Sequence, residues 1–353
     1  MGHSARPGKK PAPVQTRVDS GFPKRDLRQG STCLGLAVVL TALLAAQIAA
    51  SAQTYPTRPI RMLVGFSPGG PADVMARLIG QRMTTLLGQP IVVENRPGAG
   101  GTVAARTIAE AEADGYTLLL GNTSTLVISP LMHKNVGYDP LKAFTPIARL
   151  GTTADILVVN PKFPATSLGE LIAQAKANPG KLNYSTPGIG TPPHLIAEML
   201  KLKAGIDIVH VPYKSGGLSI QAVIAGEVQL TFENPAVALP LVQSGVVRAL
   251  AVTSAARHPQ AADVPTLIEG GLPDFVSESF TGVVGPAGIP PATVSKLNAA
   301  INASLKSPDV AATLTKLAVD AKPETPAEFG AFLAEDLASM TPVIKAAGLL
   351  GVE

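Results

Sequence analysis

The sequence contains no tryptophan, a single cysteine and few aromatic residues. Phe, Trp and Tyr together make up 4% of its 353 residues. The one cysteine, Cys33, lies inside an apolar segment near the N-terminus, so the chain beyond that segment has no thiol. This excludes disulfides, thiolate catalysis and cysteine-based metal sites from the remainder. The absence of Trp also argues against a sugar-binding cleft that stacks pyranose rings on indole.

The excess of positive over negative charge lies in the N-terminal segment. Seven of the 29 basic residues, but only two of the 25 acidic ones, lie within residues 1–52. The rest of the chain is therefore close to neutral, although the whole sequence carries a net charge of +4. Because nucleic-acid binding needs a basic patch, we expect no nucleic-acid partner.

The N-terminus has the pattern of a secretory signal peptide. A basic segment ends at Arg28 and is followed by the mostly apolar run CLGLAVVLTALLAAQIAA. Ala50, Ser51 and Ala52 then form a small-x-small cleavage motif. We therefore expect residues 1–52 to be a signal peptide cleaved after Ala52. An uncleaved membrane anchor is the alternative, and no second apolar run is long enough to span a bilayer.

Short apolar runs alternate with segments of helical period along the rest of the chain. The candidate strands are Arg61–Phe66, Ile91–Glu94, Thr117–Gly121, Ile156–Asn160, Asn183–Ser185, Asp207–Val211, Gln229–Glu233, Arg248–Val252 and Gly282–Gly285. The candidate helices are Pro71–Leu87, Leu171–Ala177, Pro192–Ala204, Leu218–Ala225, Ala292–Leu305, Pro308–Leu317 and Pro326–Ala347. This alternation predicts an α/β architecture with mainly parallel sheets.

The strands are too many for one small sheet, so we expect two α/β lobes. The run ADILVVNPKFP (154–164) reads as a crossing into a second unit, and GGLPDFVSESFTGVVGPAG (270–288) reads as the return. The predicted boundaries are residues 53–155 plus 279–353 for the first lobe, which is discontinuous, and residues 156–278 for the second.

The stretch GFSPGG (65–70) spells the G-x-S-x-G of a serine-hydrolase nucleophile elbow. The oxyanion hole of that fold uses the backbone N–H of the residue after the nucleophile. Here that residue is Pro68, which has no N–H, so a main source of transition-state stabilisation would be missing. No histidine stands in a recognisable triad context. The hypothesis of a hydrolase using Ser67 is therefore disfavoured, and we expect no catalytic residue.

The same loop is better suited to binding an anion. Gly69 and Gly70 allow the backbone to approach a ligand closely, and Pro71 suits the first turn of the following helix. Free N–H groups at a helix N-terminus favour a carboxylate or phosphate. Asp73, in the same turn, can cap the helix or accept a hydrogen bond from a ligand. A tight turn without a ligand is the alternative for this loop taken alone.

Further loops rich in hydroxyl, amide and glycine groups follow other predicted strands. They are GNTST (121–125), YSTPGIGTPPH (184–194), VPYKSGG (211–217) and FENPA (232–236). Each could simply cap a helix, but ligands of open α/β sheets bind at the carboxyl ends of strands, where all of these loops lie. Their repetition predicts an anion site held by neutral dipoles between two lobes.

Cofactor and metal sites are not expected. The second glycine-rich loop, ENRPGAGGTVAA (94–105), has Val103 where the dinucleotide fingerprint anchored on Gly98 needs its third glycine. We therefore interpret that loop as a turn that supports packing and shapes the neighbouring loops. No cluster of histidine and carboxylate residues has the spacing of metal ligands.

Taken in order, many segments resemble the Bug/TctC family of periplasmic solute-binding proteins. The matching stretches are YPTRPIRMLVGFSPGGPADVMAR, QPIVVENRPGAGG, ADGYTLLLGNTST, YDPLKAFTPIA, ANPGKLNYSTPGIGTPPHL, DIVHVPYK, RALAVTSAAR, DVPTLIEGGLP and GPAGIPP. The resemblance extends from about Tyr55 to the C-terminus. It implies a two-lobed periplasmic-binding-protein fold of the second type, which closes on a small carboxylate in the cleft. It also implies a periplasmic monomer that delivers its ligand to a membrane permease of one large and one small subunit.

The resemblance implies a set of ligand-binding residues as well. They are Phe66, Ser67, Gly70, Ala72, Asp73, Asn122, Thr123, Ser124, Thr186, Gly190, Thr191, Tyr213, Lys214 and Asn234. The chain departs from the family at Ala72, where Thr is common, at Glu233, where Asp is common, and at SGGLSI (215–220), where Gly-Ser-Ala-Pro is usual. These departures line the expected cleft, so the identity of the carboxylate does not carry over. A protein that presents its ligand to a membrane sensor is the alternative function.

Overall fold

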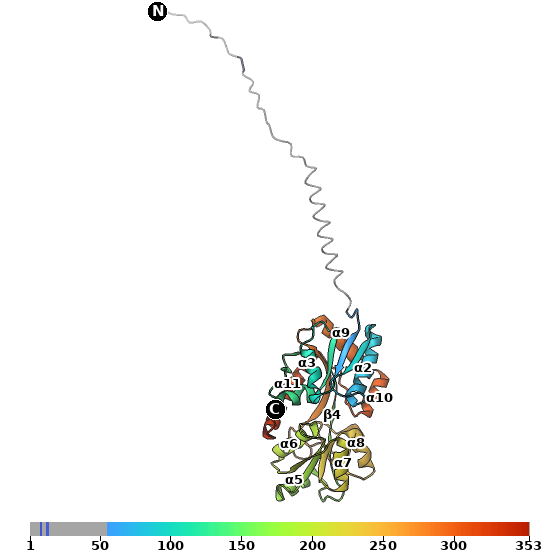
Figure 1. The fold of residues 1–353 in the computed structure, drawn as a ribbon, viewed down its shortest axis with the longest axis vertical. Coiled ribbons are helices and arrows are strands. Elements are labelled where there is room, and N and C mark those ends of the chain that lie inside the picture. The colour runs from blue at the N-terminus through green and yellow to red at the C-terminus, as the bar shows by residue number, and fades with distance from the viewer. Residues whose placement is uncertain (1–7, 9–11, 14–54, 353) are drawn as a thin grey trace, which may run out of the picture. The chain divides into compact units, whose positions relative to one another are not determined.

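The computed structural model describes residues 55–352, together with residues 8, 12 and 13. Apart from those three residues, the predicted signal peptide and its cleavage site lie outside the described residues. From Tyr55 onward the chain forms one compact unit built on two five-stranded sheets (Figure 1). No helix within the described part is both long and apolar enough to cross a membrane.

The first sheet has the strand order β2-β1-β3-β10-β4. Its strands are β1 (Ile60–Val64), β2 (Ile91–Asn95), β3 (Thr117–Asn122), β4 (Phe144–Ala154) and β10 (Glu278–Pro286). Strand β1 pairs in parallel with β2 and β3, whereas β10 is antiparallel to both β3 and β4. The associated helices are α2 (Pro71–Leu87), α3 (Thr102–Ala109), α4 (Ser129–Met132), α9 (Pro291–Leu305), α10 (Pro308–Lys316) and α11 (Pro326–Ala346), with short helical turns η1 (Ala99–Gly101) and η2 (Ser124–Ile128).

The second sheet has the order β7-β6-β8-β5-β9. Its strands are β5 (Ile156–Val159), β6 (Asn183–Thr186), β7 (Val209–Pro212), β8 (Leu230–Glu233) and β9 (Arg248–Val252). Strand β5 is antiparallel to β8 and β9, whereas β6 is parallel to β7 and β8. The helices here are α5 (Leu168–Ala177), α6 (Pro192–Ala204), α7 (Gly216–Ala225) and α8 (Pro235–Gln243), with the short turn η3 (Pro259–Ala261).

Each sheet therefore has four strands in one direction and one reversed strand, as expected where a chain crosses between two units. One crossing runs from β4 to β5 through Asp155 alone, and the other returns to the first sheet at β10. The two helix-flanked sheets confirm the predicted two-lobed α/β fold class. The residue boundaries of the lobes stay a prediction.

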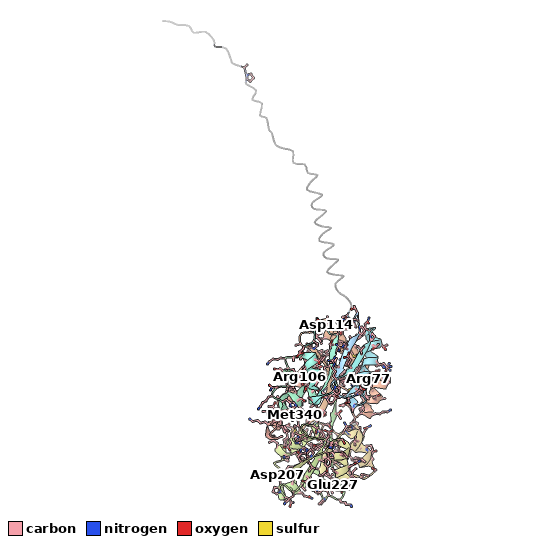
Figure 2. All side chains as sticks on the ribbon, viewed as in Figure 1. Arg77, Arg106, Asp114, Asp207, Glu227 and Met340 are labelled. Atoms are coloured by element: carbon pink, nitrogen blue, oxygen red, sulfur yellow. The ribbon has the colours of Figure 1, made fainter. Side chains whose placement is uncertain are left out.

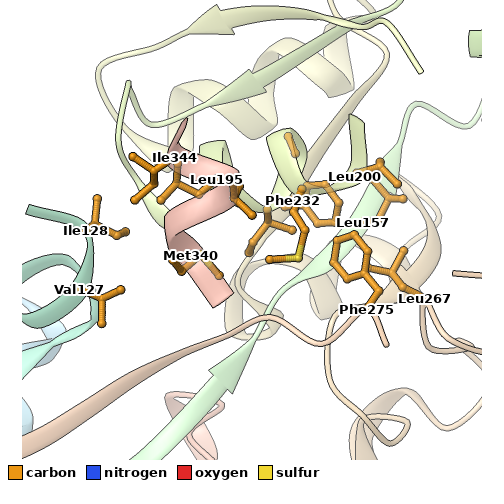
Figure 3. Close-up of a cluster of buried hydrophobic side chains, with 14 of the residues drawn as sticks. Val127, Ile128, Leu157, Leu195, Leu200, Phe232, Leu267, Phe275, Met340 and Ile344 are labelled. Atoms are coloured by element: carbon orange, nitrogen blue, oxygen red, sulfur yellow. The ribbon is translucent and has the colours of Figure 1, made fainter. Parts of the chain in front are cut away.

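The hydrophobic core is continuous across the junction of the two lobes on one side only. One cluster packs under α2, α9 and α10 on the first sheet, and another packs under α7 and α8 on the second. The third cluster is shared: it joins Ile128 of η2, Leu195 of α6, and Met340 and Ile344 of α11 (Figure 3). Met340 lies where the two lobes meet (Figure 2). Helices α6 and α11 thus bind the lobes together along one face.

Candidate functional site

Asp73 holds the loop between β1 and α2 in shape. This residue is 4% exposed, and protein donors occupy both of its carboxylate oxygens. Oδ2 accepts hydrogen bonds from Gly69 N (2.9 Å) and Arg77 Nε (3.0 Å), and Oδ1 accepts one from Asn95 Nδ2 (2.9 Å). The hydrogen bonds from Arg77 and from the Gly69 amide hold the pKa of Asp73 at about 2. An ionised Asp73 therefore orients the loop, and its oxygens are already engaged.

The rest of this loop leaves donors available to a ligand. Gly70 is the N-cap of α2, and no side chain caps this helix, so the N–H groups of its first turn have no side-chain partner. Ser67 is exposed, and the Phe66 carbonyl is tied down by Asn95 Nδ2 at 3.0 Å. Ala72 lies half-buried in the first turn of α2. The loop can thus present backbone dipoles and one hydroxyl to an anion.

The loop after β3 uses most of its polar groups internally. Asn122 Oδ1 accepts a hydrogen bond from Thr125 N (3.0 Å) and also lies 3.1 Å from Thr125 Oγ1. Thr123 Oγ1 accepts one from Phe280 N (2.8 Å), which fastens this loop to β10. The Ser124 hydroxyl makes no hydrogen bond to another described residue. Of the three predicted residues in this loop, Ser124 therefore has the freest side chain.

Three loops of the first lobe are nested against one another through glycine. A Cβ atom at Gly65 would lie 2.5 Å from Gly101 Cα, and one at Gly101 would collide with Thr125 Oγ1. Thr125 Oγ1 in turn donates to the Gly100 carbonyl (3.0 Å). Gly100 and Gly101 both have positive φ, which suits glycine. The glycine-rich loop therefore supports the two loops on either side of it.

In the second lobe, the loop after β6 approaches the first lobe. The Thr186 hydroxyl is buried and lies 2.6 Å from His210 Nε2, and Thr191 Oγ1 donates to the Gly188 carbonyl (2.7 Å). Gly190 has φ +73°, and a Cβ atom there would lie 2.6 Å from Met132 Sδ of α4. The loop after β6 thus contacts α4 of the first lobe, and Thr123 and Pro192 line one small cavity, so the loops after β3 and β6 face each other. Helix α6, like α2, begins without a side-chain cap.

A pair of stacked histidines supports the loop after β6. The rings of His194 and His210 lie 4.1 Å apart at 22°, and Tyr184 stacks on His210 at 4.9 Å. His194 Nδ1 accepts a hydrogen bond from Gly190 N (3.2 Å), so this nitrogen carries no proton. Burial lowers the pKa of both histidines, and that of His210 reaches about 4. The shape of the loop therefore depends on neutral imidazoles.

We expect these histidines to make the protein less stable as the pH falls. Their pKa values in the folded state lie below the ordinary value of 6.5, so the unfolded chain binds more protons between pH 6.5 and about 4. Stability is therefore lost as the pH falls through this window. Glu198 opposes the effect on both rings and Lys201 adds to it. Urea unfolding at pH 7 and pH 4.5 should show that the free energy of unfolding falls less in His210→Gln than in the wild type. An equal fall in both proteins would show that His210 does not cause the loss of stability.

The three remaining predicted residues, Tyr213, Lys214 and Asn234, differ in how their side chains are engaged. The Tyr213 hydroxyl donates to Glu227 Oε2 (3.3 Å), and Glu227 lies at the end of the second lobe away from the first (Figure 2). The phenol thus points away from the facing loops. Lys214 is exposed and forms no hydrogen bond or ion pair with another described residue. Asn234 caps α8, since its Oδ1 accepts from Ala236 N (2.8 Å).

Two buried carboxylates lie at the same end of the second sheet. The sequence placed Glu233 in a loop of the expected cleft, but neither Glu233 nor Asp155 was among the predicted ligand contacts. Asp155, between β4 and β5, is 7% exposed, and Glu233, the last residue of β8, is 9% exposed. Burial, with the charge of Glu233, raises the pKa of Asp155 to about 7, and burial also raises the pKa of Glu233. For Asp155, the sequence feature that could have identified it is a single acidic residue between two apolar segments of the chain.

A separate groove of about 600 Å³ lies at another edge of the junction. It is lined by β4, the loop after β9 and the segment that follows α10, and it contains none of the predicted site residues. Across the described part of the chain, no three His, Cys, Asp or Glu side chains are grouped so as to hold a metal ion. The predicted residues instead gather on the loops after β1, β3, β6, β7 and β8, and their contact with a ligand stays a prediction.

The sequence matches a known protein family over most of its length. The profile described as "Tripartite tricarboxylate transporter family receptor" matches residues 75–349. The protein BugT of Bordetella pertussis is 37% identical over 316 residues, which cover 89% of this chain and 97% of BugT.

Solved structures agree with this match. A protein of R. palustris solved with adipate is 33% identical with a TM-score of 0.70, covering 84% of this chain and 99% of that one. MatC of Rhodopseudomonas palustris, solved with bound malate, is 34% identical with a TM-score of 0.68, covering 82% of this chain and 100% of that one. These identities are high enough to relate the chains in sequence as well as in fold.

Proposed function

The chain belongs to the family of tripartite tricarboxylate transporter receptors, and on this premise we propose that it captures a small organic carboxylate and delivers it to a membrane permease. Members of the family are solute-binding receptors, not enzymes. The permease of this proposal has one large and one small subunit. The proposal includes export to the periplasm by residues 1–52, cleavage after Ala52, and action as a monomer.

One observation carries the proposal: two helices, one in each lobe, begin without a side-chain cap beside the facing loops. These are α2 after β1 and α6 after β6, although Pro192 and Pro193 leave only one N–H group, that of His194, in the first turn of α6. Free N–H groups at helix N-termini favour anions. The exposed Ser67 and the unengaged Ser124 hydroxyl add donors without adding charge. The relatives solved with adipate and with malate support a carboxylate as the ligand class.

The expected affinity is compatible with transport. A hydrogen bond to a charged group contributes roughly 1.5–3 kcal/mol. Four or five such bonds, less the costs of ordering and desolvation, leave about 8 kcal/mol, which corresponds to a micromolar Kd. The predicted contacts are Phe66, Ser67, Gly70, Ala72, Asp73, Asn122, Thr123, Ser124, Thr186, Gly190, Thr191, Tyr213, Lys214 and Asn234.

A thermal-shift screen of di- and tricarboxylates, acidic amino acids and aromatic acids tests the proposal. The cognate acid at roughly 100 times its Kd should add about 2.7 kcal/mol to the free energy of unfolding. Matched neutral compounds, such as the corresponding diamides, serve as controls and should leave the melting temperature unchanged. If no acid in a broad set shifts the melting temperature, the proposed function is wrong.

A further inference from the structure

The ring of His194 fixes the loop that connects β6 to α6. His194 is the third residue of α6 and is 5% exposed. Its Nδ1 accepts the hydrogen bond that Gly190 N donates at 3.2 Å. Two of the predicted ligand contacts, Gly190 and Thr191, lie in this loop, and a third, Thr186, immediately precedes it. A single acceptor atom on a buried ring therefore determines where the backbone of the loop lies.

Gly190 is also a point at which the second lobe touches the first. A Cβ atom at Gly190 would lie 2.6 Å from Met132 Sδ and 2.8 Å from Met132 Cε, so the backbone itself packs against this side chain. Met132 is the last residue of α4, a helix of the first lobe. The hydrogen bond to His194 thus holds Gly190 in contact with the opposite lobe. A loop that shifts at Gly190 changes this contact and the place of its ligand-binding groups together.

The surroundings of the ring favour its neutral form. His210 of β7 stacks on His194 with the ring centres 4.1 Å apart, and Tyr184 of β6 stacks on His210. Tyr184 and Lys201 both donate to Glu198 Oε1, at 2.6 and 2.8 Å. Burial lowers the pKa of both histidines most; Glu198 raises it and Lys201 lowers it further. Within the described residues, β8 and α11, which also pack against α6, add no charged group to this set.

We propose that His194 is a positioning residue of the ligand site, and that tight binding of the carboxylate requires its neutral ring. The inference rests on the proposed function and adds a dependence on pH to it. A proton on Nδ1 converts the acceptor into a donor that faces the Gly190 N–H, so the hydrogen bond is lost. The loop then leaves its place against Met132. The pKa of His194 lies below 6.5 in the folded protein, so affinity is full at pH 7.5 and is lost as the ring gains its proton below that value.

Two variants of His194 separate the acceptor from the titration. His194→Asn places an amide oxygen near the position of Nδ1 and does not titrate, whereas His194→Leu has no acceptor. Calorimetry with malate and with adipate at pH 7.5 should show binding about tenfold weaker in His194→Leu. Between pH 7.5 and 4.5 the wild type should lose at least about threefold more affinity than His194→Asn. Protonation of the acid itself is common to both proteins and does not affect this comparison.

His258→Asn is the matched control. His258 Nδ1 also accepts a backbone N–H, from Gln260 at 3.2 Å, but it lies in the loop after β9, which holds no predicted ligand contact. This variant should bind both acids as the wild type does at each pH. A wild type that loses no more affinity in acid than His194→Asn overturns the inference and leaves the proposed function standing.

The proton on the ring of His194 can also be located without any ligand. Long-range ¹H–¹⁵N NMR spectra of the wild type at pH 7.5 should show it on Nε2, with Nδ1 unprotonated. A proton on Nδ1 at this pH overturns the inference, whether or not the variants fold. If malate, adipate and every acid of the thermal-shift screen fail to bind, the proposed function falls and this inference falls with it.

Discussion

Replacing Glu324 with alanine should lower the free energy of unfolding by roughly 3–5 kcal/mol, because the change leaves Arg149 as an unpaired charge in the core. Arg149 on β4 donates to Glu324 through Nε (3.1 Å) and Nη2 (2.7 Å), and the two side chains are only 6% and 4% exposed. The guanidinium carbon also lies 3.8 Å from the centre of the Phe332 ring of α11. Chemical denaturation of purified protein gives the measurement.

Two further variants make the Glu324 prediction specific. Glu335→Ala removes an exposed carboxylate of α11 and should change stability by no more than about 0.5 kcal/mol. Replacing the pair together, as Arg149→Met with Glu324→Leu, should cost less than Glu324→Ala alone, because no buried charge is left without a partner. A Glu324→Ala variant as stable as Glu335→Ala would show that Arg149 finds another partner. Asp336, whose pKa burial raises to about 6 and the charge of Arg149 lowers, is one candidate.

Gly65→Ala should destabilise the protein by about 1–3 kcal/mol and distort the loop that follows β1. The new Cβ atom would lie 2.5 Å from Gly101 Cα and 3.0 Å from Gly101 O. Because these are backbone atoms, no side-chain rotation relieves the contact, and one loop must move. Displacing either loop disturbs the network through which Asp73 holds Gly69. Urea denaturation measures the loss, and calorimetry with an acid identified in the thermal-shift screen should show weaker binding.

Gly70→Ala is the matched control in the same loop. Gly70 has φ −77°, a value that any residue adopts, and a Cβ atom there would lie 3.6 Å from the Ser67 carbonyl, an ordinary contact. Its free energy of unfolding should therefore stay within about 0.5 kcal/mol of the wild type. If both variants are equally stable, the packing of Gly65 against Gly101 is not what shapes this loop.

Much of the fold could be predicted from the sequence because its elements carry local signals. Helix α2 was predicted with its observed bounds, since Pro71 begins it and Gly88 ends it in the left-handed conformation. Strand β4 was not predicted, although it is the longest strand at eleven residues. Pro146, Arg149 and Gly151 interrupt its apolar pattern, and pairing along β10 stabilises it instead. Such long-range pairing leaves no local trace in the sequence.

The sequence predicted where the site lies better than it predicted the hydrogen-bond partners and burial of the side chains there. The loops could be identified because each follows a strand and precedes a helix. The sequence did not indicate that Asp73 is engaged by Asn95 or Thr123 by Phe280, since those partners come from distant segments. Asp155 became conspicuous only through its burial, which depends on how the two sheets meet. Spacing along a chain does not report such burial.

The shared core between the lobes has a consequence for the order in which the protein folds. Met340 and Ile344, which complete that core beside Leu195, lie close to the C-terminus. A chain that is synthesised or exported from its N-terminus therefore delivers these side chains last. The second sheet is already complete by then, with the apolar surface of α6 still exposed to water. Until α11 arrives, the lobes are joined only by the two chain crossings and lack their shared core, and the exposed apolar surface makes this interval vulnerable to aggregation and proteolysis.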